Sequence, residues 1–190
     1  MADLITIETY KQAKAIASSK DDERLGILIP SVSQLVKTYC ANSFIDYVTA
    51  QKTEYITIEW TTNRVQLTES PIIAVATVSQ RTTTTEDYEE LTVLEDYAVN
   101  ARADTIDKVS GNWPEGVEAV KVVYTAGYAT LPADLTLVLI DLIAYYFKEE
   151  YKTIRTLSGA SMHNTNTSSL VGNLGFPDHI KRVLDMYKQI

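Results

Sequence analysis

The 190-residue sequence contains little cysteine, histidine or positive charge, and each shortage excludes a class of protein. A single cysteine, Cys40, cannot form an internal disulfide. Two histidines, His163 and His179, leave little material for a structural zinc site or a Ser-His-Asp triad. The 17 lysines and arginines are outnumbered by 25 aspartates and glutamates, so the net charge is −8. A protein that binds duplex DNA by neutralising phosphates needs an excess of Lys and Arg over Asp and Glu.

The sequence also lacks the short motifs that mark common active sites. It contains no GxxxxGKS/T or GxGxxG phosphate loop, no HExxH metal motif, no GxSxG nucleophile motif and no CxxC pair. Asp141, inside an apolar segment, is either a catalytic acid or, as we favour, a carboxylate in a polar seam that accepts a hydrogen bond from a neighbouring Tyr or Lys. We therefore predict a non-enzymatic protein without cofactor or metal, in which Cys40 is a buried, inert thiol.

The order of the residues divides the chain into helical and strand-like parts. Residues 1–51 have apolar side chains at helical spacing and predict two helices. The first follows Thr6, a suitable N-cap, and ends near Ser18-Ser19. The second begins at the acidic pair Asp21-Asp22, which complements the helix dipole. One apolar stripe runs along this second helix: Leu25, Leu28, Ile29, Val32, Val36, Tyr39 and Cys40.

Residues 52–128 change to an alternating pattern rich in Thr, Val, Ile and Tyr, which is typical of strands. We predict about six or seven short antiparallel strands in this block. The first is expected at 55–60, with Trp60 on the same side as Ile58. A turn at Thr62-Asn63 is expected to pair it with 65–67 as a hairpin. The block holds six basic residues against thirteen acids, so nearly all the excess negative charge lies in it.

Residues 129–155 return to a helical pattern and are unusually apolar. In the stretch 135–147, only Thr136 and Asp141 are not apolar. This stretch is shorter than the roughly 17 to 25 residues that cross a bilayer, so we expect no membrane partner. A helix that is apolar on every side cannot lie on a solvated surface. We therefore expect neighbouring subunits to cover part of it.

The rest of the chain is a polar linker followed by a helix. Residues 156–175 are rich in Ser, Thr, Asn and Gly and contain no Lys, Arg, Asp or Glu. Such long segments are uncommon in compact domains, so we expect this one to become ordered against a partner. Residues 176–190 predict a short amphipathic helix that begins at Pro177. It must dock on another surface, because so short a helix does not persist alone.

Two clusters of charged residues have alternative explanations. Lys148, Lys152 and Arg155 fall on one helix face, where they either complement the helix dipole or form salt bridges with the acidic block of an adjacent subunit. The acids of the strand block are either a solvated strand edge or, in a ring, the lining of a channel. The acids assigned to the channel are Glu86, Asp87, Glu89 and Glu90.

These patterns together predict an α+β protein with a helical core and a large antiparallel β insertion. The core is expected to consist of residues 1–51 and 129–155, with two N-terminal helices and one long apolar helix. Residues 52–128 are the acidic insertion. Residues 156–175 link the core to a short C-terminal docking helix at 176–190.

Several segments, taken in order, carry a family resemblance: Leu4 to Lys11, Asp21-Asp22 before a helix, Glu69 to Val75, Asp96 to Asn100, Trp113 to Gly116, Val120 to Tyr128 followed by Leu131 to Leu135, and Phe176 to Tyr187. In this order and spacing the chain resembles the head-tail connector adaptor proteins of tailed bacteriophages, also called head-completion proteins. The resemblance covers nearly the whole chain. Its β insertion looks longer than that of compact members.

The resemblance implies a non-enzymatic ring, typically of twelve copies, in the virion neck below the portal protein. Such a ring is assembled in the host bacterial cytoplasm and extends the channel through which genomic duplex DNA passes without specific binding. It also offers a platform for the next component, such as a tail-terminator, stopper or other neck protein. On this hypothesis, ring packing is assigned to Leu137, Ile140, Tyr145 and Phe147, and portal docking to Pro177, Ile180, Leu184 and Tyr187.

Three other interpretations stay open at this point. A tail-completion or other neck protein would differ only in which ring it contacts. A nucleic-acid-binding regulator is disfavoured by the net charge and by the lack of an aromatic and basic groove. A hydrolase built on the β insertion would need His163 or His179 to approach an acid and a nucleophile.

Overall fold

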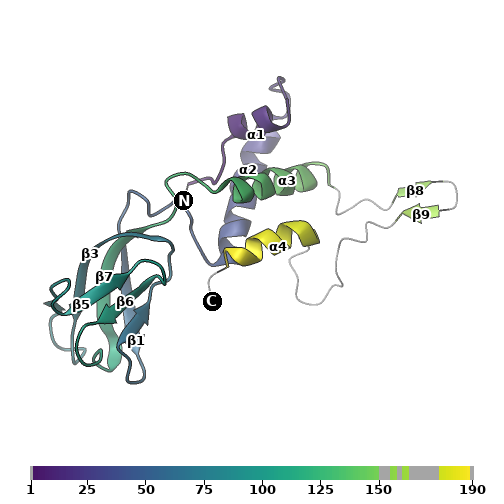
Figure 1. The fold of residues 1–190 in the computed structure, drawn as a ribbon. Coiled ribbons are helices and arrows are strands. Elements are labelled where there is room, and N and C mark those ends of the chain that lie inside the picture. Colours follow the sequence, from purple (N-terminus) through teal and green to yellow (C-terminus); the bar gives the residue numbers. More distant parts are fainter. Residues whose placement is uncertain (1, 150–154, 158–159, 163–175, 189–190) are drawn as a thin grey trace. The chain divides into compact units, whose positions relative to one another are not determined.

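The computed structural model describes residues 2–149, 155–157, 160–162 and 176–188, and the chain forms two compact units (Figure 1). Unit 1 consists of Met1–Asn42 and Leu131–Ile190, and unit 2 is Ser43–Thr130. Unit 2 is therefore built from one continuous stretch of chain that interrupts unit 1. The described residues contain four helices and antiparallel sheets, which confirms the α+β class.

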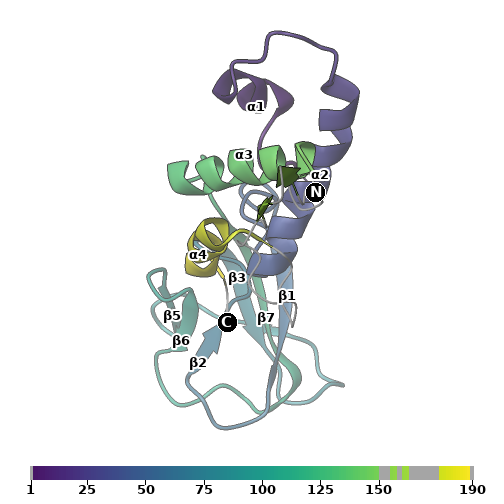
Figure 2. The same cartoon turned by 90° about the vertical axis from the view of Figure 1, so that its right-hand side faces the viewer.

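Unit 1 is built on four helices: α1 (Ile7–Ala13), α2 (Asp22–Cys40), α3 (Ala133–Phe147) and α4 (Asp178–Met186). α2 packs against the other three, and α3 also packs against α4, as Figure 2 shows. A separate pair of short strands, β8 (Arg155–Leu157) and β9 (Ala160–Met162), completes the described part of the unit. Each helix contributes fully buried or nearly buried side chains to the core: Tyr10, Leu25, Ile29, Val32, Val36, Leu135, Leu139, Leu142, Ile143, Ile180 and Leu184.

The ends of the first two helices follow from local chemistry. Thr6 is the N-cap of α1, because its hydroxyl accepts a hydrogen bond from the backbone N–H of Thr9 at 3.2 Å. α1 ends at Ala13, which is shorter than predicted, and Ala15 then turns the chain with a φ of +53°. α2 begins after Asp21 with acidic residues in its first turn, as expected, and ends at Cys40, after which the C-cap Ala41 adopts the left-handed conformation.

Unit 2 consists of two antiparallel sheets (Figure 1). The larger sheet has the order β1 (Lys52–Ile58), β7 (Gly116–Ala126), β3 (Ile72–Gln80) and β4 (Glu89–Glu90). The smaller sheet has the order β2 (Arg64–Gln66), β6 (Thr105–Lys108) and β5 (Tyr97–Asn100). Both sheets contribute to one core, which includes Ile58, Val65, Ile72, Val78, Tyr97, Ile106, Trp113, Val120, Val122 and Tyr124.

The predicted hairpin between 55–60 and 65–67 is wrong. β1 pairs with β7, with Tyr55 opposite Lys121, and β2 pairs with β6, with Val65 opposite Ile106. Trp60 lies beyond the end of β1 and is 69% exposed, so it does not share a buried side with Ile58. The chain around Thr62 crosses from one sheet to the other, and long-range pairing with β6 and β7 overrides the local turn signal.

Unit 2 begins before the predicted insertion because the segment after α2 joins its larger sheet. The backbone N–H of Tyr128 donates to the carbonyl of Phe44 at 2.6 Å, and that of Ala126 donates to Tyr47 at 3.0 Å. Phe44 is fully buried and its ring stacks on Tyr128. The two ends of unit 2 are therefore tied together by backbone hydrogen bonds.

Candidate assembly surfaces

α3 is covered mainly by its own unit. Of the four residues assigned to ring packing, Ile140 and Tyr145 are 8% and 6% exposed, and Leu137 is 60% exposed. The expectation that a neighbouring subunit must cover Ile140 and Tyr145 is therefore wrong, because α2 and α4 pack along α3. Phe147 is half-buried, and the Arg24 guanidinium lies 4.6 Å from its ring centre. Leu137 is the assigned residue that remains available to a neighbour.

Asp141 has an ordinary structural partner. The Lys14 Nζ donates to the Asp141 Oδ1 at 3.1 Å, and both side chains are more than a third exposed. This contact joins the end of α1 to the middle of α3 and accounts for the one acid of the apolar stretch. Asp141 therefore accepts a hydrogen bond from a lysine, one of the two kinds of partner that we favoured.

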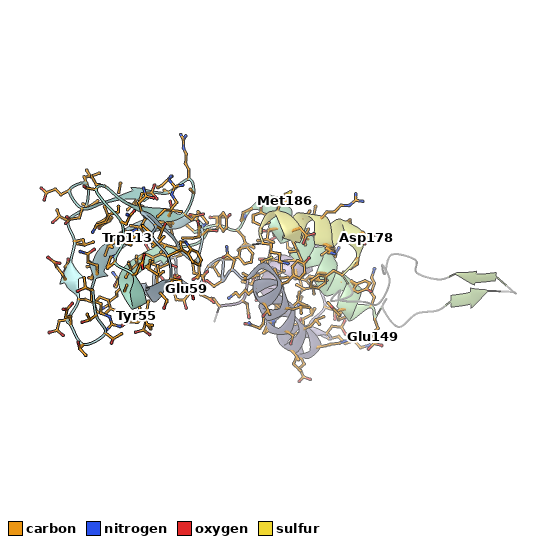
Figure 3. The ribbon with its side chains drawn as sticks, turned by 90° about the horizontal axis from the view of Figure 1, so that it is seen from below. Tyr55, Glu59, Trp113, Glu149, Asp178 and Met186 are labelled. Atoms are coloured by element: carbon orange, nitrogen blue, oxygen red, sulfur yellow. The ribbon has the colours of Figure 1, made fainter. Side chains whose placement is uncertain are left out.

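The basic end of α3 is only partly described. Lys148 is exposed just after the helix, while Lys152 and the side chain of Arg155 lie outside the described residues. Arg24 pairs with Glu149 at 3.5 Å, and both side chains are about half exposed (Figure 3 labels Glu149). Such an exposed pair contributes little to stability, because water screens it. The proposed salt bridges to an adjacent subunit stay a prediction.

α4 is held on unit 1 by polar contacts near its C-terminal end and by an aromatic contact just before its N-terminal end. The Tyr39 hydroxyl donates to the Asp185 carboxylate, and the Tyr187 hydroxyl donates to the Asp134 carboxylate at 2.7 Å. The ring of Phe176 packs edge-on against Tyr39, with centroids 5.2 Å apart. These contacts join residues far apart in sequence, so they fix the C-terminal helix on α2 and α3.

Cys40 is completely buried where α2 meets α4. Burial raises the pKa of the Cys40 thiol to about 12, and Cys40 lies 3.6 Å from the Leu184 carbonyl, to which it donates a weak hydrogen bond. Burial, followed by the hydrogen bond to Asp185, raises the pKa of Tyr39 to about 12. Cys40 is therefore a buried, protonated thiol at neutral pH, as predicted.

The residues assigned to portal docking are mostly inside the protomer. Ile180 and Leu184 are 1% and 0% exposed, and Pro177 is buried, because this face of α4 packs on α2 and α3. Their assignment as a docking surface is therefore wrong for the helix in its observed position. Met186, near the end of α4, is 70% exposed and belongs to the outer face (Figure 3).

The acids assigned to the channel are all exposed. Glu86 closes the loop after β3 by accepting hydrogen bonds from the Thr82 hydroxyl and the Thr83 backbone N–H. The Thr82 hydroxyl is the main reason that the pKa of Glu86 is lowered. Asp87 lies in the same loop, and Glu89 and Glu90 form β4, opposite Gln80 and Ser79.

A cluster of aromatic and basic side chains, which sequence reasoning missed, lies on the larger sheet. The Lys121 Nζ is 6.0 Å from the ring centre of Tyr55 and 5.7 Å from that of Tyr88. The Arg81 guanidinium is 4.6 Å from the Tyr88 ring and pairs with Glu118 at 3.2 Å. Tyr55 is 51% exposed (Figure 3). Only the pairing of β1, β7 and β3 brings these residues together, so no local sequence signal marked them.

A buried polar network connects the larger sheet to the segment before β3. The Tyr124 hydroxyl donates to Glu54 at 2.7 Å and accepts from the backbone N–H of Glu69 at 3.2 Å. Glu69 also accepts from Ser43 at 2.7 Å and pairs with Lys52 at 3.2 Å. Burial raises the pKa of Tyr124. Each carboxylate has hydrogen-bond donors, so the network is a structural one.

The net charge belongs entirely to unit 2. Counting Lys and Arg against Asp and Glu gives 11 − 11 = 0 for unit 1 and 6 − 14 = −8 for unit 2. In the described ranges, no three His, Cys, Asp or Glu residues are placed to hold a metal ion. None of the described helices has the length and hydropathy to cross a membrane.

Comparison with known proteins relates the fold to a family. A family profile described as "Head completion protein" matches residues 3–190. The head completion protein of Escherichia phage T5 is 30% identical over 89 residues, which are 46% of this chain and 48% of that protein. The chain thus matches about half the length of this curated relative.

Solved structures share the fold at low sequence identity. A chain from the neck of an empty gene transfer agent (GTA) particle, computed with C6 symmetry, aligns with a TM-score of 0.60 at 12% identity, covering 98% of this chain and 90% of that one. A chain from the neck of a native GTA particle, computed with C12 symmetry, aligns with a TM-score of 0.55 at 12% identity, covering 100% and 94%. Because the family profile matches nearly every residue, the chain belongs to the head completion protein family.

Proposed function

We propose that this protein is a non-enzymatic structural adaptor of a phage virion neck. Copies of the chain, twelve in number, form a ring below the portal protein, extend the DNA channel and provide a platform for the next neck or tail component. The observation that carries the proposal is the head completion family match over residues 3–190. We further propose that the ring is assembled in the host bacterial cytoplasm.

Two observations support a ring. The fold is shared with neck chains from particles computed with C6 and C12 symmetry. Leu137 is 60% exposed on the largely apolar helix α3 and offers an apolar contact to the next copy. Identical head-to-tail contacts of this kind close into a ring when the rotation per copy divides a full turn.

The distribution of charge supports a DNA channel without specific binding. Unit 2 carries all the net charge, and the side chains of Glu86, Asp87, Glu89 and Glu90 are exposed. Like charge on a channel wall keeps the phosphate backbone hydrated and prevents tight binding. We propose that these four acids face the passing duplex.

We assign the portal contact to the C-terminal part of the chain, and specifically to the outer face of α4, which carries Met186. The buried residues Ile180 and Leu184 hold the helix in place, while Met186 and its exposed neighbours Asp178 and Arg182 are available for contact. A contact surface of this kind combines an apolar residue with a charged rim.

Two substitutions separate ring formation from portal binding. Leu137→Glu places a charge in the proposed ring contact and should convert the assembled protein into monomers, as measured by native mass spectrometry. Met186→Glu should leave the ring mass unchanged and weaken binding to purified portal protein by at least about tenfold. A Leu137→Glu protein with the ring mass of the wild type would contradict the assigned interface.

A further inference from the structure

The turn between β4 and β5 displays the most exposed large hydrophobic side chain of the described residues. Leu94 is 77% exposed, and its φ of +68° lies in the left-handed region. In that region the Cβ of a non-glycine residue crowds the following carbonyl, so glycine or asparagine is normally found there. Leu94 therefore combines an unfavourable backbone conformation with an apolar surface left in water.

A comparison with Phe44 shows why this combination is unusual. Phe44 also has a positive φ, +62°, but its side chain is completely buried and its ring stacks on Tyr128. Burial of a large ring offsets the cost of the backbone conformation. Leu94 has no such compensation within its unit, which points to a contact made with another molecule.

The turn is rigid in spite of its exposure. The Asp96 carboxylate accepts from the Thr92 backbone N–H at 2.8 Å, and the Asp96 N–H donates to the Thr92 carbonyl at 2.9 Å. The Leu94 N–H donates to the carbonyl of Tyr97 at 2.7 Å, and Tyr97 is 4% exposed. The backbone that carries Leu94 is thus held in one conformation, so binding costs little backbone entropy.

The residues around Leu94 indicate the composition of the surface that would bind it. Val93 is 51% exposed, and Val109, 53% exposed, lies beside the turn because its N–H donates to the Asp96 carbonyl at 2.9 Å. The exposed acid Glu95 follows Leu94 in the turn, and the unit that carries the turn has a net charge of −8. An apolar centre with a charged rim is the composition of a protein interface.

We propose that residues 92–97 form a plug that inserts Leu94 into an apolar socket, rimmed by Lys or Arg, on the neck component that joins below the ring. The exposed Glu95 of the plug and the net charge of −8 on unit 2 favour this basic rim. A groove at α1 and α2 of a second copy is the poorer receiver, because Asp3 and Glu8 border its apolar residues Ile29 and Pro30. The inference rests on the proposed neck function.

Binding to the purified neck component that follows the head completion protein in the same particle tests the plug. Leu94→Asn should weaken binding at least about tenfold, whereas Leu94→Met, which keeps an apolar side chain, should stay within about threefold. Val117→Thr, at another exposed apolar residue of unit 2, is the matched control and should change binding less than about twofold. Raising the salt from 50 to 500 mM should weaken wild-type binding.

Measurements of stability and of assembly distinguish a failure of the plug proposal from a failure of the ring proposal. The melting temperature of Leu94→Asn should equal or exceed that of the wild type, because asparagine tolerates the left-handed conformation. A clearly lower melting temperature would make Leu94 a structural residue and overturn the plug, as would wild-type-like binding by Leu94→Asn. Loss of ring mass in Leu94→Asn would place the leucine against a second copy instead. If the wild type forms a ring but does not bind the next component, the plug fails while the ring proposal stands.

Discussion

A methyl group on Gly127 would lie 2.1 Å from the carbonyl oxygen of Phe44, and the φ of Gly127 is +110°. The close approach is fixed by backbone hydrogen bonds on both sides, from Tyr128 to Phe44 and from Gly127 to Pro71. Glycine is needed here because no other residue allows the segment after α2 to lie so near the end of β7. This one residue thus lets the two ends of unit 2 meet.

We expect Gly127→Ala to lower the free energy of unfolding by about 3 kcal/mol, from steric overlap and backbone strain. Gly26→Ala is the matched control, because a Cβ there meets no atom within 4 Å and the residue lies inside α2. It should raise the free energy of unfolding by roughly 0.5 to 1 kcal/mol. Urea denaturation of both variants gives these values, and equal effects of the two substitutions would contradict the role of Gly127.

At the same scale, sequence reasoning succeeded where a residue acts through its near neighbours. The Thr6 cap depends on an N–H three residues later, and the buried Cys40 follows from the apolar stripe of α2. It failed where residues meet through strand pairing. Lys121 on β7 lies near Tyr55 on β1 and near Tyr88, in the loop before β4, only because the strands of the larger sheet pair as they do.

Among the elements, α4 shows how a short amphipathic helix is divided between two roles. Leu184 is completely buried on the inner face, while Met186 is 70% exposed on the outer face. The inner face gives the helix its stability, because nine residues are too few for a helix to persist alone. The outer face is free to serve a different contact.

Leu184→Ala should therefore destabilise unit 1 by about 3 kcal/mol, since it removes buried methyl groups and leaves a cavity. Met186→Ala should change stability by less than about 0.5 kcal/mol. Limited proteolysis offers a local readout, in which only the Leu184 variant becomes cleavable within α4. Equal susceptibility of both variants would show that the helix is not held by its inner face.

The helix α3 shows that the composition of a helix does not predict which elements pack against it. Its apolar character was visible in the sequence, but the sequence did not show which elements would cover it. α2 and α4 do so, which leaves Leu137 exposed and removes Ile140 and Tyr145 from the proposed interface. An apolar pattern indicates that a helix surface must be covered, but it does not identify the elements that cover it.

For the whole molecule, the main division is between a neutral helical unit and an acidic β unit. The charges sum to zero in unit 1 and to −8 in unit 2. Unit 2 has its own core and is formed by one continuous stretch whose ends are hydrogen-bonded to each other. These are the properties of an inserted domain that can fold by itself.

We therefore expect residues 43–130, produced alone, to fold cooperatively and to show a β-type circular dichroism spectrum with a single thermal transition. The Gly127→Ala form of the same fragment is the control, and it should melt at a lower temperature because the closure of the unit is strained. A wild-type fragment without a cooperative transition would show that unit 2 depends on unit 1.

The sequence by itself determined the α+β class, the acidic strand-rich block, the Thr6 cap of α1 and the family resemblance. All of these depend on residues that are close along the chain or on summed composition. The tertiary structure alone decided that β1 pairs with β7, that α4 covers α3, and that Leu94 is held exposed in a rigid turn. Those features depend on contacts between segments that are distant in the sequence. A local pattern of residues does not reveal the free energies of such contacts.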